Sequence, residues 1–303
     1  MKKRHYSIVL AISLIWLLLT GVALAAESTP IDGKEYYKTV YNEYKDKPLA
    51  VEAQSLLSAP IGSAIIDMKL EGFAKDAKVC KMTVDVALQM AHKKDQTKFK
   101  VISYIEQEPK DVIIYHYMDK KWTKQKRENV QLFNVEPNNV EDNLQVIKSV
   151  EVLQYTPEIT ELKINFDFNM VKDIVKKTID TDNVNFKNQK ERDEVLKTYE
   201  SLIPYLNKVQ VLETVDNKNK TLTNTIDFTD IIKDAVNAVV STMPEITANE
   251  RKEIEDFLQD SKAVVSIRAK ILKKAATIKV PTVAKKLAEE IKPATVKVEV
   301  ETK

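Results

Sequence analysis

Apolar and polar residues alternate along the sequence from Ile61 to about Lys126. The alternation is clearest in residues 66–71, 81–90 and 99–105, where nearly every second side chain is apolar. This period of two gives an extended strand one apolar and one polar face. Polar, turn-forming segments at 93–96 and 108–111 separate these strands. We therefore expect an antiparallel meander whose apolar face must be covered by another layer of the protein.

The strand predicted over Val112–Met118 departs from this pattern, because apolar or aromatic residues occupy both of its faces. Such a strand is covered on both sides, at least in part. Further strands are predicted at 159–168, 208–214, 221–228 and 263–271, with a hairpin turn at 216–219. Helical periodicity is found at 169–179, 195–203, 230–240, 247–258 and after Pro281.

Two helical segments are also expected near the N-terminus. A stripe at helical spacing follows the capping signal at Asp32 and consists of Tyr37, Val40, Tyr41 and Tyr44. After Pro48, residues Ala50 to Leu57 are expected to resume as helix. Strands with helices inserted late describe an α+β fold, in which a long, curved antiparallel sheet is covered on its concave side by helices.

The first 25 residues resemble a secretory leader. Residues 2–4 are basic, residues 8–19 form an uncharged apolar run, and Ala23-Leu24-Ala25 fits a cleavage site. We expect an exported protein, periplasmic, cell-surface or extracellular, that is cleaved after Ala25. The alternative is a leader that is retained as an anchor. No cysteine directly follows the apolar run, so the leader has no site for the lipid attachment of bacterial lipoproteins.

Removing the leader changes the charge balance. The full chain has a formal charge of +2, and the leader contains three basic and no acidic residues, so 44 basic and 45 acidic residues remain, a charge of −1. A near-neutral chain with interspersed charges lacks the basic patch that nucleic-acid binding requires. Nucleic acid is therefore not an expected partner.

Few residues are available for catalysis or metal binding. Outside the leader the only glycines are Gly33, Gly62 and Gly72, too far apart for a phosphate-binding loop. Cys80 has no partner for a disulfide, and we expect a small buried hydrophobe rather than a reactive thiol. No Cys/His spacing describes a metal site, so no cofactor and no metal are predicted.

Two histidines remain outside the leader. His92 is expected in an exposed turn, and His116 is either a buried, hydrogen-bonded strand residue or a polar residue that lines a pocket. No serine lies in a nucleophile-elbow sequence, and no pair of carboxylates stands out as an acid and base. We therefore predict no catalytic residues and a protein that is not an enzyme.

The apolar strand faces give the one positive indication of function. A curved sheet closed by helices can leave an apolar cavity, and such cavities bind hydrophobic ligands. The predicted lining residues are Met68, Leu70, Val84, Val86, Leu88, Val101, Ile114, His116 and Phe166. The alternative is that these residues form an ordinary filled core. Methionine adapts to irregular apolar partners, and four lie on neighbouring predicted strands: Met68, Met82, Met90 and Met118.

Two segments carry a resemblance to a known family. The first is Ile66-Asp67-Met68-Lys69-Leu70-Glu71-Gly72, and the second is Tyr115-His116-Tyr117-Met118-Asp119-Lys120-Lys121-Trp122-Thr123-Lys124. In these segments and in the order of leader, helix and strands, the chain resembles the exported bacterial proteins that share the half-barrel fold of the lipoprotein carriers (LolA- and LppX-like proteins). The resemblance in sequence covers Tyr36 to Lys126. In the rest of the chain it rests only on the order of the predicted helices and strands. Lys120 replaces the glycine and Thr123 the tyrosine of those relatives.

The resemblance implies a half-barrel sheet with a lipid or acyl-chain cavity between sheet and helices. It implies transport or sensing of a hydrophobic molecule at the cell envelope, with transient contact to a membrane or an envelope protein. The other hypothesis is a non-enzymatic structural or interaction module of the envelope with a filled core. We expect residues 26–303 to form a single domain, and a division near 137–158 is the alternative.

Overall fold

The structure is a computed structural model. It describes residues 32–74, 77–91, 96–127, 146–170, 189–241 and 247–290. The leader, His92 and residues 93–95 of the predicted turn at 93–96 lie outside these residues. So do most of the helix predicted over 169–179 and part of the linker-like stretch 137–158.

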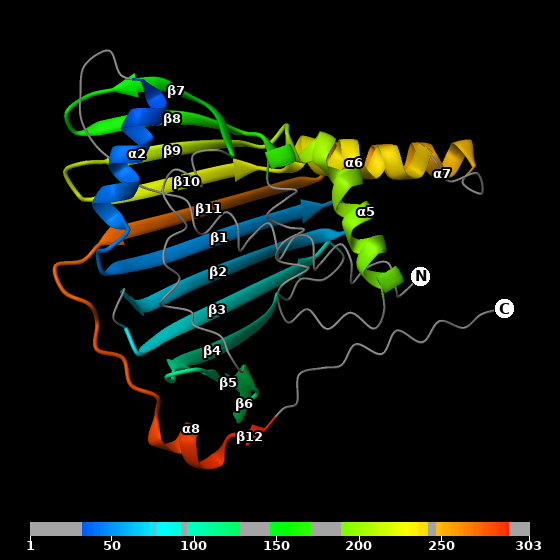
Figure 1. The fold of residues 1–303 in the computed structure, drawn as a ribbon. Coiled ribbons are helices and arrows are strands. Elements are labelled where there is room, and N and C mark those ends of the chain that lie inside the picture. Colours follow the sequence, from blue (N-terminus) through cyan, green and yellow to red (C-terminus); the bar gives the residue numbers. More distant parts are fainter. Residues whose placement is uncertain are drawn as a thin grey trace.

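A single open sheet of twelve strands dominates the protein (Figure 1). The strand order is β12-β6-β5-β4-β3-β2-β1-β11-β10-β9-β8-β7, and all pairs are antiparallel except the short parallel pair β12–β6. The strands of the first half are β1 (Leu49–Ala59), β2 (Gly62–Phe73), β3 (Val79–Met90), β4 (Thr97–Gln107), β5 (Val112–Met118) and β6 (Lys121–Arg127). The remaining strands are β7 (Ile147–Tyr155), β8 (Ile159–Phe166), β9 (Gln210–Asp216), β10 (Thr221–Asp227), β11 (Lys262–Ile271) and β12 (Glu289–Glu290).

Five helices accompany the sheet in the described residues, and together they make an α+β fold. They are α2 (Gly33–Tyr44), α5 (Gln189–Leu206), α6 (Thr229–Ser241), α7 (Ala248–Gln259) and α8 (Thr282–Leu287). Asp32 caps α2 by accepting a hydrogen bond from the backbone N–H of Lys34, as predicted. A capping box begins α7, with hydrogen bonds between Thr247 and Glu250.

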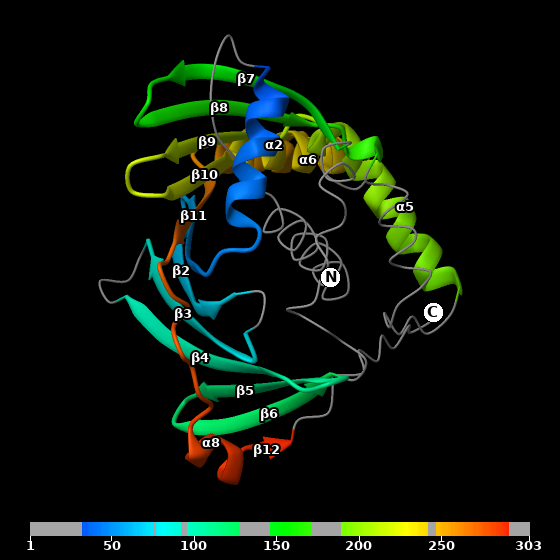
Figure 2. The same cartoon turned by 60° about the vertical axis from the view of Figure 1, so that its left-hand side comes forward.

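The sheet curves around α2, so that it has a concave and a convex face (Figure 2). One row of directly paired residues defines the concave face: Glu213, Asn224, Ile267, Ala53, Met68, Val84 and Val101. Along each strand, every second residue counted from its member of this row lies on the same face. The convex face carries the residues between them. Among the few glycines, Gly72 has φ +80° and lies where the register of β1 and β2 shifts, which is a β-bulge.

The main hydrophobic core lies between α2 and the concave face of β7–β11. The aromatic stripe predicted on this helix is buried, with Val40 fully inaccessible and Tyr37 and Tyr44 nearly so. Opposite it lie Leu162, Ile164, Val211, Val215, Leu222 and Ile226. Apolar side chains at helical spacing on α2 therefore meet apolar side chains at strand spacing, which buries both sets.

A second, smaller core lies on the opposite face of the other half of the sheet. Val280, which precedes α8, and the fully buried Ala284 of α8 cover the convex face of β5 at Tyr115. Tyr104, Ile113 and Trp122 pack around them on the same face. The convex side of Val112–Met118 is therefore covered, whereas its concave side is buried at Val112 and exposed at Met118. Helix α2 and helix α8 cover opposite faces of opposite halves of one sheet.

One prediction from the sequence is wrong. Residues Ala50 to Leu57 are not helical but belong to β1, at the centre of the sheet, paired with both β2 and β11. Pairing on both sides overrides the helical propensity of this segment, because it satisfies every backbone group along the strand. The edge strand β7 lies within residues 137–158, and its Val150 and Val152 face α2.

Candidate functional site

The register of the sheet places all nine predicted lining residues on the concave face. Met68, Val84 and Val101 are direct neighbours in one row across β2, β3 and β4. The adjacent positions on the same face are Leu70, Val86, Leu88, Ile114 and His116. Phe166 lies on the same face in β8, beyond β1, β11, β10 and β9, and packs under α2. The structure therefore brings eight of the nine together on β2–β5 and places Phe166 apart, in the main core.

A rim of large apolar side chains borders this part of the concave face. Five of them keep between 36% and 49% of their surface exposed: Leu57, Leu88, Met90, Phe99 and Met118. They come from β1, β3, β4 and β5 and lie toward one end of the strands, the end at which Ala59, Gly62 and Met90 are paired. Single exposed apolar residues are ordinary, but a contiguous set on a curved face is typical of an interaction site.

The convex face of the same strands has the opposite character. It carries a hollow of about 360 Å³ whose charged residues are Glu52, Asp67, Lys69, Asp85 and Arg268. Several of these are already paired. The Gln54 amide donates to Asp67 at 2.7 Å, and Lys100 forms an ion pair with Asp85 at 2.9 Å. Ala53 and Met68 also border the hollow, but its other lining residues are charged or polar, which makes it costly to bury an apolar ligand there.

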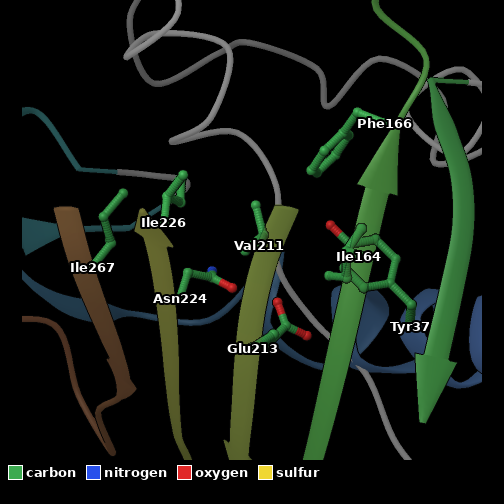
Figure 3. Close-up of a pocket in the computed structure, with 8 residues that line it drawn as sticks. All are labelled: Tyr37, Ile164, Phe166, Val211, Glu213, Asn224, Ile226 and Ile267. Atoms are coloured by element: carbon green, nitrogen blue, oxygen red, sulfur yellow. The ribbon is translucent and has the colours of Figure 1, made fainter. Parts of the chain in front are cut away.

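A small buried pocket lies under α2, between the helix and strands β8–β11 (Figure 3). Its volume is about 10 Å³, which is room for about one water molecule and far below that of a typical ligand site. Tyr37 closes it from the helix, and Glu213 and Asn224 are cross-strand partners that point into it (Figure 3). Phe166 lines the same pocket.

Glu213 is the most unusual residue of this pocket. It is 1% exposed, and neither of its carboxyl oxygens has a hydrogen-bond partner among the described residues. Burial raises the pKa of Glu213 to about 8, and the neighbouring Asn224 side chain opposes this only in part. The carboxyl group is therefore uncharged at neutral pH.

Three tyrosines of α2 lie close enough to interact electrostatically with this carboxyl group. Tyr36, Tyr37 and Tyr44 reach inward from α2 and Thr160 lies on β8, and all four hydroxyls are buried without a partner among the described residues. Burial raises the pKa of each of the three tyrosines, so all remain neutral donors. The cluster is a neutral polar island inside the main core.

Sequence reasoning did not find Glu213. The apolar residues Val211 and Val215 occupy inward positions of β9, and Glu213 falls in the same alternation. A charged residue at an inward position was the available signal, but the sequence alone does not show which face of β9 meets a helix.

His116 is hydrogen-bonded on the concave face. Its Nδ1 lies 2.9 Å from the Oγ of Ser103, its cross-strand partner on β4. Ser103 is buried and His116 half-buried, and burial lowers the pKa of the imidazole from its ordinary value. His116 is therefore a hydrogen-bonded, half-buried strand residue that keeps part of its surface on the concave face. Cys80 is buried on this face, and burial raises the pKa of its thiol to about 12.

Within the described residues, no three His, Cys, Asp or Glu side chains come together in a way that could hold a metal ion. None of the helices in the described part of the chain is long and apolar enough to cross a membrane.

Three comparisons with known proteins found no relative. No family model matches the chain, no curated protein matches it, and no solved structure matches the fold.

Proposed function

We propose that this protein binds the acyl chain of a lipid on the concave face of its sheet, as an exported protein of the bacterial cell envelope. The observation that carries the proposal is the concave face of β1–β5. Its side chains are almost all apolar, and five large ones at its rim remain between 36% and 49% exposed. The half-barrel resemblance and the leader support the same proposal.

The curvature and charge of this face favour an acyl chain over a broad protein partner. The concave face spans five strands, or about 20 Å at the usual spacing between strands. A flexible chain can follow an inward-curved surface of this width and bury apolar area along its whole length. Ion pairs and charged side chains lie on the convex face of the same strands, at Asp67, Asp85 and Lys100.

The second candidate is a non-enzymatic structural or interaction module of the envelope. The filled core under α2 favours it, because the enclosed pocket there holds only about 10 Å³. In that case the apolar concave face would bind another protein or a second copy of the chain.

Lipid extraction tests the proposal. The protein is purified from bacterial cells without detergent, and bound acyl chains are counted by mass spectrometry. Leu88→Glu adds a charge to the concave face at an exposed position, whereas Ala87→Glu adds the same charge one residue away on the convex face of β3. We expect acyl chains bound to the wild type and to Ala87→Glu, and a several-fold loss in Leu88→Glu. Absence of acyl chains from all three proteins would favour the interaction module.

A further inference from the structure

The concave face changes its chemistry between β5 and β6. On β1–β5 the titratable side chains of this face are the buried Cys80 and His116. On β6 every concave position is polar: Lys121, Thr123, Gln125 and Arg127 are the cross-strand partners of Met118, His116, Ile114 and Val112. The face is therefore amphipathic across the strands, apolar over β1–β4 and polar at β6.

His116 lies at this boundary. Ser103 is 1% exposed, and its hydroxyl has no acceptor other than His116 Nδ1 among the described residues. A buried hydroxyl without an acceptor is costly, so we assign the Ser103 hydroxyl as the donor and Nδ1 as the acceptor. The ring hydrogen is then on Nε2, and His116 offers one N–H donor beside an apolar surface.

Cationic groups lie on the polar side of this boundary. Lys121 lies diagonally across from His116, within reach of a long side chain. Neither Lys121 nor Arg127 forms an ion pair among the described residues. In contrast, Lys124 and Lys126, on the convex face of the same strand, are paired with Glu290 and Asp111. A ligand group at the concave side of β6 therefore meets an N–H donor, the Thr123 hydroxyl and the charge of Lys121. Glu289 of β12 is the cross-strand partner of Thr123 and lies on the same face, so the two cations Lys121 and Arg127 and this one carboxylate leave the edge with one net positive charge among the described residues.

We propose that the ligand is an acyl amphiphile with an anionic, oxygen-containing head, which binds between His116 and Lys121 while its chain lies over β4–β1. This inference rests on the proposed function and adds the polarity and direction of the ligand. Oxygen acceptors of the head receive the Nε2 hydrogen of His116 and the Thr123 hydroxyl hydrogen. The chain can extend only toward β4, because β6 presents no apolar side chain on this face.

Competition between ligands that share one chain tests the inference. The full-length protein is loaded with the neutral apolar fluorophore N-phenyl-1-naphthylamine, and displacement is measured at neutral pH. The competitors are hexadecanoate, methyl hexadecanoate and hexadecyltrimethylammonium, which carry an anionic, a neutral and a cationic head. We expect hexadecanoate to displace the fluorophore at about three- to tenfold lower concentration than the methyl ester, with the cation weakest.

Substitutions on both faces of the sheet test where the anionic head of the ligand binds. His116→Leu and Lys121→Gln should each reduce the preference for hexadecanoate by about threefold or more, and His116→Gln, which keeps an N–H donor, should retain most of it. Lys124→Gln changes the same charge on the convex face of β6 and should have no effect. The inference would be overturned if all three competitors displaced the fluorophore equally well and if displacement from Lys121→Gln was the same as from the wild type. Acyl binding itself would remain intact in that case. Failure of the fluorophore and of every competitor to bind would contradict the proposed function itself.

Discussion

The first residue of α2, Gly33, lies directly against the backbone of Val150 in the edge strand β7. A Cβ atom at position 33 would come within 2.2 Å of the Val150 carbonyl oxygen. The helix that closes the main core therefore begins at a position where a side chain has no room. This contact explains why one of the few glycines of the chain lies at the start of a helix.

Gly33→Ala should consequently destabilise the protein. The new methyl group must push α2 away from β7 and disturb the packing of Tyr36 and Tyr37, a loss of about 1–3 kcal/mol, as for other overpacked sites. The midpoint of urea unfolding measures this loss. Lys38→Ala, also on α2 but half-buried, is the control and should leave the midpoint nearly unchanged. Equal midpoints for the two variants would show that α2 does not pack against β7 as described.

Glu213 should make the stability of the protein depend on pH. Its pKa is about 8 in the folded protein against an ordinary value of 4.5, so the folded state holds a proton that the unfolded state releases. The free energy of unfolding must therefore fall as the pH rises from 4.5 to about 8, by up to about 5 kcal/mol for a shift of this size.

Glu213→Gln removes the ionisable group and keeps its shape, so most of this fall should disappear. Urea unfolding at the two ends of the pH range gives the comparison. Glu161→Gln, on the convex face of the neighbouring strand β8, should keep the wild-type fall. A parallel loss of stability in Glu213→Gln and wild type would mean that Glu213 is not buried as a neutral carboxyl group.

Cys80 should resist alkylation in the folded protein. Its thiol is buried, and burial raises its pKa to about 12, so very little thiolate is present at neutral pH. Iodoacetamide should modify Cys80 only after unfolding in urea, as detected by intact mass. In a Cys80→Ala protein, Lys98→Cys places a thiol at an exposed position of β4 and should react rapidly. Rapid labelling of Cys80 in the native protein would contradict its burial.

The sequence predicted the faces of individual strands better than it predicted their neighbours. Alternation in β2, β3 and β4 correctly grouped Met68 with Leu70 and Val84 with Val86, because a period of two depends only on local geometry. The row that joins Met68 to Ala53 and Ile267 depends on β11, which follows β1 by more than 200 residues. No local pattern encodes a pairing of that range.

The errors have the same origin. Ala50 to Leu57 is rich in good helix formers, and only pairing with β2 and β11 makes it a strand. The polar pocket was missed because the residues that line it around Glu213 come from three other elements: Asn224 on β10, Ile164 on β8 and Tyr37 on α2. His116 was recognised as a candidate from its own strand, but Ser103, which orients its ring, became visible only through the register of β4 and β5.

The most direct test of the central claim is where an acyl chain binds. Trp16 and Trp122 are the only tryptophans, and Trp122 lies on the convex face. In the first variant both tryptophans are replaced by phenylalanine and Phe99→Trp is added, so that the single tryptophan lies on the concave face. In the matched control only Trp16→Phe is made, so that Trp122 on the convex face is the single tryptophan. A brominated fatty acid quenches tryptophan only at contact range. We expect it to quench the tryptophan at position 99 strongly and Trp122 weakly; equal quenching, or none at position 99, would contradict acyl binding on the concave face.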